Sequence, residues 1–230
     1  MNIKILHMID GARKSTGTTV VIDVFRAFSV EAYFLSEGAE AIIPVGDCEV
    51  AYRLKKENPQ MILAGERHGK ILPGFDVGNS PTDLMKLDIE GKTVVHTTSA
   101  GTQGIANAVN AREILGAGLV NAKATAEYIM KSGATEVSLV CMGLEALSQT
   151  EEDNLCAEYI KSLLAGETID MKTEIEKLKY TSGAKFFDKA QNDVFPENDF
   201  YMCTGVDKFD FAMKLFAGND GISYMKKINI

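Results

Sequence analysis

The strongest constraint on the fold is an alternation that repeats along the chain. Short apolar runs, many of them rich in β-branched residues, are each followed by a segment with helical spacing of its apolar residues. The runs lie at 19–24, 41–45, 61–65, 93–98, 113–117 and 136–141. Continuous apolar runs of this length are typical of strands buried on both faces. Repeated strand–helix units therefore predict an α/β fold with a mostly parallel sheet and helices on both faces.

The last third of the chain has a different pattern. After about residue 150 it is mostly helical, and the spacing predicts helices at about 151–165, 170–191 and 205–216, followed by an edge strand at 222–228. We find no internal repeat, low-complexity tract or linker, so residues 1–230 are expected to form a single domain. Exposed apolar helices in this last third could support a homo-oligomer.

Charge and composition exclude several classes of protein. The net charge is −8, which argues against nucleic acid as the main partner because phosphate backbones require a basic face. No apolar run approaches the roughly 18–20 residues of a membrane span. The four cysteines are far apart and form no CxxC pair, which favours free thiols in a reducing cytoplasm. A local basic pocket for a small anion remains compatible with the whole-chain charge.

Polar clusters follow several of the predicted strands. They lie at 23–29, 66–67, 97–102 and from Gly143 onward. In open α/β sheets, ligands bind beyond the carboxyl ends of the strands. The coincidence of these clusters with strand ends therefore indicates one shared site.

The first cluster combines an acid, an arginine and a hydroxyl. Asp23 ends a buried strand, where a lone carboxylate is costly unless it is paired or bound to a metal. Arg26 and Ser29 follow at the expected start of a helix, where free N–H groups and the guanidinium favour a phosphate or carboxylate. The alternative is an Asp23–Arg26 pair that only caps the helix.

A glycine-rich loop follows the third strand. Glu66 has the hard oxygen atoms that Mg²⁺ prefers, and Arg67 beside it adds a cation. Asn79 and Ser80 precede Pro81, so they either cap a helix or contact a ligand. His68 is expected to be solvent-exposed.

Two further clusters have weaker local signals. Thr97, Thr98, Ser99, Gly101 and Thr102 place hydroxyls and a glycine at a strand-to-helix turn, a composition that suits a small anion. Glu152 and Asp153 begin a helix. Acids in that position usually complement the helix dipole, and a metal-binding role is the alternative.

Together these segments resemble the 2-phosphosulfolactate phosphatase family, also called ComB, of coenzyme M biosynthesis. The matching stretches occur in the family's order and cover roughly residues 18–165. They are VIDVFRA at 21–27, GERHG at 65–69, GFDVGNSP at 74–81, Thr97-Thr98, Gly101-Thr102, Asn121, and Glu152-Asp153 with Cys156.

The resemblance implies a three-layer α/β/α fold with a mixed sheet. It also implies Mg²⁺-dependent hydrolysis of a phosphate monoester on a small sulfonated acid. The catalytic residues it implies are Asp23, Arg26, Ser29, Glu66 and Arg67, with Asp23 and Ser29 as candidate nucleophiles. The substrate would contact Asn79, Ser80, Thr97, Thr98, Ser99, Gly101 and Thr102. The metal would be held by some of Asp23, Glu66, Glu152 and Asp153.

The sequence also departs from the family pattern. Ala100 and Gln103 stand where an asparagine and an arginine are expected, Leu144-Glu145 is an additional element, and Glu158 replaces a glycine. Two alternatives to 2-phosphosulfolactate hydrolysis therefore stay open. One is a hydrolase of a different phosphorylated hydroxy acid, which the changes at Ala100 and Gln103 favour. The other is a non-catalytic anion-binding protein, which Glu158 near the expected site would favour.

Overall fold

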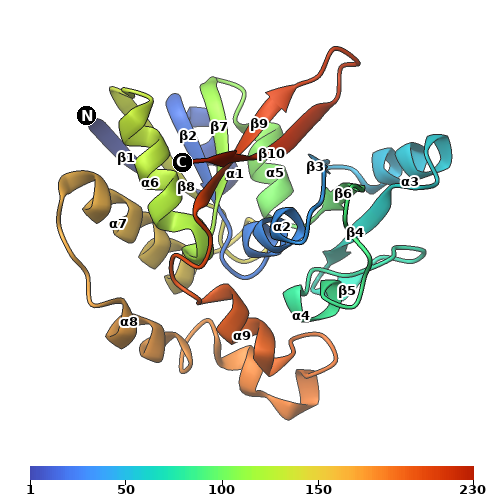
Figure 1. The fold of residues 1–230 in the computed structure, drawn as a ribbon. Helices are drawn as coiled ribbons and strands as arrows, with labels where there is room; N and C mark the ends of the chain where they lie inside the picture. Colours follow the sequence, from blue (N-terminus) through green and yellow to red (C-terminus); the bar gives the residue numbers. More distant parts are fainter.

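A mixed sheet of ten strands runs through the whole molecule, with helices on both of its faces (Figure 1). The computed structural model describes residues 1–230. The predicted three-layer α/β/α fold is confirmed. The strands are β1 (Asn2–His7), β2 (Gly17–Ile22), β3 (Ala41–Pro44), β4 (Ile62–Arg67), β5 (Lys70–Ile71), β6 (Thr93–Thr97), β7 (Ala111–Ala117), β8 (Glu136–Cys141), β9 (Phe211–Ala217) and β10 (Ser223–Asn229).

The sheet contains two parallel groups joined by a hairpin. The strand order is β1-β8-β2-β7-β9-β10-β3-β6-β4-β5. Strands β1, β8, β2 and β7 are parallel to one another, and so are β3, β6 and β4. Between them, β9 and β10 make antiparallel pairings with each other and with β7 and β3.

The pairings on either side of the hairpin are narrow. One residue pair, Met225 with Ile42, joins β10 to β3, and two pairs join β7 to β9. Such short contacts let the sheet bend, and neighbouring strands add a right-handed twist at each step. As a result, residues that follow the carboxyl ends of β2 and β8 line the same cavity as residues at the ends of β4 and β6.

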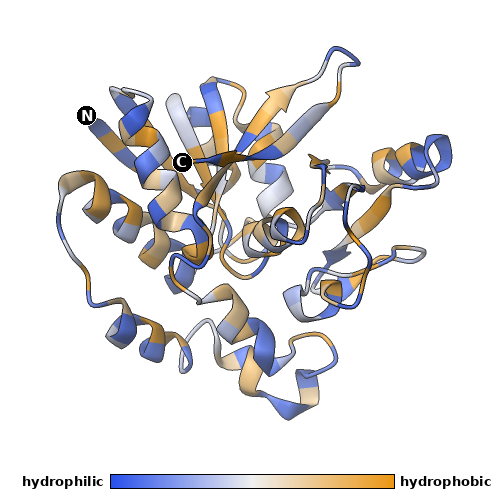
Figure 2. Ribbon diagram, in the orientation of Figure 1, coloured by the Kyte–Doolittle hydropathy of each residue, from blue (hydrophilic) through white to orange (hydrophobic).

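The helices form the two outer layers. They are α1 (Met8–Lys14), α2 (Ala27–Ser36), α3 (Cys48–Glu57), α4 (Pro81–Leu84), α5 (Gly101–Asn107), α6 (Ala122–Lys131), α7 (Glu151–Ala165), α8 (Met171–Leu178) and α9 (Glu197–Cys203). One core joins α1, α2 and α5 to one face of both parallel groups. On the other face, α6 and α7 cover β2, β7 and β8, and α3 covers β3, β4 and β6. Apolar residues are concentrated in the strands and on the inner helix faces (Figure 2).

The last third of the chain differs from the sequence-based expectation. The helix predicted at 205–216 is wrong, because residues 211–217 form β9. Met213 is buried on one face of β9, while Lys214 on the other face reaches Glu113, which is the two-residue period of a strand. The strand predicted at 222–228 exists as β10, but it lies inside the sheet and not at its edge.

Two further differences from the predicted elements concern residues 170–191 and the N-terminal strand. The single helix expected at 170–191 is instead α8 followed by two short 3-10 turns, Ala184–Phe187 and Lys189–Gln191. Strand β1 was not predicted, because Lys4 interrupts its apolar residues. The four cysteines are free, as expected, and no helix is long and apolar enough to cross a bilayer.

Candidate active site

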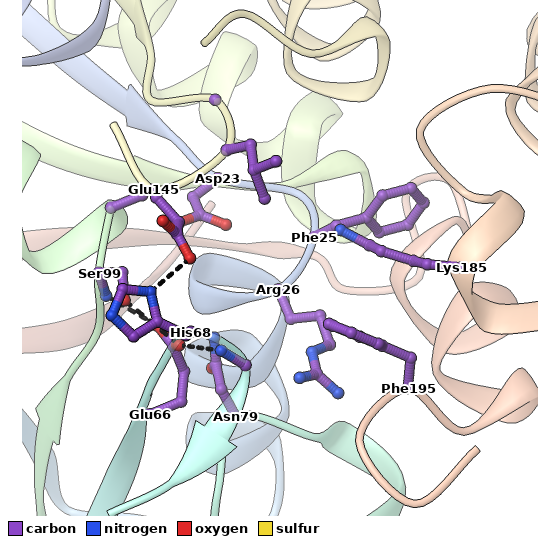
Figure 3. A pocket seen from close by; sticks show the side chains of 14 residues that line it. Asp23, Phe25, Arg26, Glu66, His68, Asn79, Ser99, Glu145, Lys185 and Phe195 are labelled. Carbon is purple, nitrogen blue, oxygen red and sulfur yellow. Dashed lines mark hydrogen bonds and ion pairs between the residues drawn. The ribbon is translucent and has the colours of Figure 1, made fainter. Parts of the chain in front are cut away.

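One small polar cavity lies where the carboxyl ends of four strands meet. Its volume is about 110 Å³, which is enough for a few water molecules or one small organic anion. Residues after β2, β4, β6 and β8 line it, and the segment before α9 closes one side (Figure 3). The lining residues are Asp23, Phe25, Arg26, Glu66, His68, Gly69, Asn79, Ser99, Ala100, Gly143, Leu144, Glu145, Lys185 and Phe195.

Asp23 lies one residue beyond β2 and is 5 % exposed. Its Oδ1 accepts a hydrogen bond of 3.0 Å from the N–H of Ala27 at the start of α2, and no side chain donates to its Oδ2. Burial raises the pKa of Asp23 to about 6, and the negative charges of Glu66 and Glu152 add to the increase. The carboxylate is therefore close enough to other acids to feel their repulsion.

Glu66 is held rigidly by backbone donors from two segments. Its Oε1 accepts from the Ser99 N–H at 2.7 Å, and its Oε2 accepts from the Gly69 N–H at 2.6 Å. The Ser99 hydroxyl lies 3.3 Å from the same Oε2. Glu66 thus ties the end of β4 to the turn after β6, and its carboxyl group lines the cavity.

Arg26 is a buried cation with a fixed position. Its Nη1 donates to Asp199 Oδ2 and to the Val194 carbonyl, both at 2.8 Å. The guanidinium carbon lies 4.9 Å from the centre of the Phe195 ring. Arg26 and Asp199 are 4 % and 0 % exposed, so this ion pair is desolvated and its geometry is constrained. Nη2 makes no hydrogen bond within the protein and is available to a ligand.

Lys185 is the second cation of the cavity and is not among the residues predicted from the sequence. Its ammonium lies 5.2 to 5.7 Å from the centres of Phe25, Phe186 and Phe195. Burial lowers the pKa of Lys185, an effect that Glu152 opposes and Arg26 reinforces. No motif marks this lysine, because it lies in a short 3-10 turn more than 150 residues after Arg26 in the chain.

A solvent-exposed contact between His68 and Glu145 lies at the rim of the cavity. His68, after β4, places its Nδ1 2.8 Å from Oε1 of Glu145 in the loop after β8. The His68 side chain is 80 % exposed, which agrees with the expectation from sequence. Glu145 was not predicted as a site residue, although it belongs to the additional Leu144-Glu145 element. Both residues adopt positive φ angles, 52° and 53°.

Several residues singled out from the sequence support the cavity without lining it. The Ser29 hydroxyl is fully buried and donates to the Val24 carbonyl, so it faces away from the cavity. Arg67 binds the carbonyls of Glu66 and Gly46 and the Thr97 hydroxyl.

The threonine hydroxyls of the cluster at 97–102 make hydrogen bonds within the protein. Thr98 and Thr102 bond to each other around the first turn of α5. Ser80 caps α4, as one sequence reading expected, and donates to Asp199. Gly101 packs closely against Asp23: a Cβ atom added to Gly101 would lie 3.0 Å from Oδ2 of Asp23. Of the predicted substrate contacts, Asn79 and Ser99 line the cavity.

The four acids proposed as metal ligands do not form one cluster. Both oxygens of Asp153 accept backbone hydrogen bonds, from Val24 and Gly143 at 2.8 Å. Glu152 is buried beside the cavity, and its Oε2 has no hydrogen-bond partner. The structure contains no group of three or more acidic, histidine or cysteine side chains arranged to hold a metal ion.

Asp23 and Glu66 still suit a hard cation. Mg²⁺ in phosphate-binding sites is usually held by one or two carboxylates, with waters and the substrate completing its shell. The cavity carries the acids Asp23, Glu66 and Glu145 against the cations Arg26 and Lys185, so a multiply charged anion would meet excess negative charge. A divalent cation between Asp23 and Glu66 would reverse that balance.

The departures from the family pattern fall in different places. Ala100 lines the cavity, whereas the Gln103 side chain donates to the Gly46 carbonyl outside it. Glu158 is exposed on α7 and pairs with Lys161 at 3.1 Å. The expectation that Glu158 lies near the site, where it would repel an anion, is therefore wrong.

Comparisons with known proteins show the family of this chain. The family model described as 2-phosphosulpholactate phosphatase matches residues 4–217. A probable 2-phosphosulfolactate phosphatase of Bacillus subtilis is 32 % identical over 197 residues, covering 85 % of this chain and 86 % of the relative. Relatives of the same description from Caldanaerobacter subterraneus and Thermotoga maritima are each 34 % identical over 213 residues; the matches cover 86 % and 87 % of this chain and 88 % and 90 % of the relatives. The chain belongs to the 2-phosphosulpholactate phosphatase family.

Proposed function

We propose that this protein is a Mg²⁺-dependent phosphatase that hydrolyses 2-phosphosulfolactate to sulfolactate and phosphate, in a cytoplasmic pathway of the coenzyme M type. The observation that carries the proposal is the pairing of two cations, the buried Arg26 and the partly buried Lys185, with two carboxylates, Asp23 and Glu66, in one small cavity. The name shared by the relatives supports the same substrate.

The cations would bind the phosphoryl group and stabilise its transition state. Phosphoryl transfer spreads negative charge over three equatorial oxygens, and fixed positive groups lower its barrier. Arg26 is held in place before the substrate arrives, by Asp199, Val194 and Phe195. Lys185 is poorly solvated, so its interaction with an anion is stronger than it would be in water.

Asp23 would face the phosphorus atom. Its Oδ2 is free of side-chain donors, whereas Ser29, the other candidate nucleophile, is occupied in the core. An ionised Asp23 either attacks phosphorus, which breaks the P–O bond to sulfolactate and forms an acyl phosphate that water then hydrolyses, or takes the proton of a water that displaces sulfolactate directly. In both cases the leaving oxygen takes up a proton that comes from water. Mg²⁺ held by Asp23 and Glu66 would supply further charge neutralisation on the phosphoryl oxygens.

The direct test is phosphate release from 2-phosphosulfolactate with Mg²⁺ and with EDTA, beside phospholactate and phosphoglycerate. We expect metal-dependent turnover of the sulfonated substrate well above the others. Release without Mg²⁺ would contradict the metal assignment. If no substrate releases phosphate but these compounds raise the Tm of the protein, an anion-binding protein is favoured.

A second candidate is hydrolysis of a different phosphorylated hydroxy acid. Ala100 lines the cavity at a position where the family pattern has an asparagine, so one polar contact to the substrate is missing. Preferred turnover of phospholactate or phosphoglycerate, and a gain of 2-phosphosulfolactate turnover in A100N, would support this candidate.

A further inference from the structure

A chain of three polar side chains leads from the cavity into the core. Asn79, in the loop before α4, lines the cavity and is 6 % exposed. Its Oδ1 lies 3.3 Å from Nε2 of His96 on β6. Nδ1 of His96 lies 2.9 Å from Oε1 of Glu31 on α2, and both residues are fully buried. The reaction proposed above uses neither His96 nor Glu31.

Glu31 has only one hydrogen-bond partner. It lies among the apolar residues of α2, its Oε1 contacts His96, and its Oε2 has no partner. A buried carboxylate is costly unless a donor compensates it, and a charged donor compensates best. One proton must therefore lie between Oε1 of Glu31 and Nδ1 of His96.

The other ring nitrogen faces an acceptor as well. The amide oxygen of Asn79 can only accept a hydrogen bond, so Nε2 of His96 must also carry a proton to bond it. His96 therefore donates from Nε2 to Asn79, whichever of Nδ1 and Oε1 holds the proton between them.

This arrangement fixes which end of the Asn79 amide meets the cavity. With Oδ1 held by His96, the NH₂ group is turned away from the core, and Nδ2 donates to no protein group. Phosphate, carboxylate and sulfonate oxygens accept hydrogen bonds, so a free NH₂ group is complementary to each of them. The reverse orientation would present an oxygen, which repels an anion.

We propose that His96 and Glu31 are positioning residues that hold the Asn79 amide with its NH₂ group toward an anionic oxygen of the substrate. The proposal rests on the proposed function of the cavity. A purely structural pair would not need this chemistry, because apolar residues of similar volume fill a core at equal or lower cost.

The first test is spectroscopic and needs no substrate. Long-range ¹H–¹⁵N spectra of protein labelled at its three histidines report the protonation of each ring nitrogen, and the variant H96F assigns the His96 signals. We expect a proton on Nε2 of His96, the atom that faces Oδ1 of Asn79. A ring with a bare Nε2 would overturn the proposal, and the protonation itself is read from the wild-type protein.

The second test is a mutant cycle with 2-phosphosulfolactate. N79A should raise KM about tenfold or more and change kcat less, because a hydrogen bond to a charged group is lost. E31L/H96F should raise KM in the same direction while keeping a cooperative thermal transition. In the triple variant the two effects should not add, because the core pair acts only through Asn79. Independent, additive effects, or an unchanged KM in E31L/H96F, would overturn the proposal.

Binding separates this proposal from the proposed function. If the wild-type protein releases no phosphate, titration calorimetry with 2-phosphosulfolactate and with inorganic phosphate replaces the kinetics, and the same non-additive loss of affinity is expected. That result would reject the phosphatase and keep the positioning role. Failure of the wild-type protein to bind either anion would overturn both.

Discussion

At the scale of single residues, the fixed position of Arg26 matters more than its charge alone. Arg26→Ala by itself would leave Asp199 buried and unpaired, which is strongly destabilising. We therefore pair it with Asp199→Asn, which keeps the acceptor for Ser80 and Thr82. R26A/D199N should lose about 10²–10³-fold in kcat/KM, since one oxyanion donor is worth about 2.7–4 kcal/mol. D199N alone should lose much less, and equal losses in the two variants would remove Arg26 from the reaction.

Gly101 tests how closely Asp23 is packed. A Cβ at this position would lie 2.7 Å from the Ala27 Cβ and 3.0 Å from Asp23 Oδ2, so Gly101→Ala must displace one of them. We expect kcat/KM to fall about tenfold or more and the free energy of unfolding to fall by about 1–3 kcal/mol, the usual cost of overpacking. The control is Gly205→Ala, where the nearest atom is 3.6 Å away. Full activity in G101A would show that Asp23 tolerates displacement.

At the scale of elements, Glu113 joins four of them. On β7, it accepts hydrogen bonds from Thr18 on β2, Tyr128 on α6 and Lys214 on β9. Burial alone would raise the pKa of Glu113, but these donors outweigh it and lower the pKa to about 2. A depressed carboxyl pKa stabilises the fold above its unfolded value near 4.5 and loses that contribution as pH falls toward 2.

The pH dependence of unfolding measures this contribution. Glu113→Gln should lower the free energy of unfolding by about 1–3 kcal/mol at pH 7, and the difference from wild type should shrink between pH 4.5 and 2. Urea titrations at several pH values would follow it. Glu136→Gln, which breaks an exposed pair with Lys4, is the matched control and should have a much smaller effect. If the difference in the free energy of unfolding between Glu113→Gln and wild type does not change with pH, Glu113 stabilises the fold through packing and not through its charge.

The strands also show which elements can be predicted from local sequence patterns alone. The continuous apolar runs predicted β2, β3, β4, β6, β7 and β8, because strands buried on both faces need no partner to be recognised. Strand β9 was mistaken for a helix, since Lys214 and the flanking residues give an ambiguous period over seven positions. The inner position of β10 depends on pairing with β3 across about 180 residues, which no local pattern contains.

At the scale of the whole molecule, the same limit applies to the candidate site. Residues directly after strands could be predicted to converge, and Asp23, Arg26, Glu66, Asn79 and Ser99 do line one cavity. Ser29 and Thr102 have suitable chemistry, but helical rotation turns them into the core. Lys185 lies in a short 3-10 turn and Phe195 in the turn before α9, away from any strand end, so only the folded chain brings them to the cavity.

The junction of the two parallel groups predicts how the molecule unfolds. Met225 is fully buried, and with Ile42 it makes the single residue pair between β10 and β3. It belongs to a core that also includes Phe28 of α2 and Val94 of β6, so both groups share one apolar cluster. A shared core makes their unfolding cooperative, although the strands that join them are narrowly paired.

Met225→Ala should therefore weaken the whole molecule and not one half. Truncation of a buried methionine costs about 2–5 kcal/mol, and at about 2–4 °C per kcal/mol for a chain of this size the Tm should fall by roughly 4–20 °C. Calorimetry should still show a single transition. The control Met130→Ala, at a half-exposed position on α6, should change the Tm little. Two separate transitions in M225A would mean that the parallel groups are independent units and that the hairpin alone assembles the cavity between them.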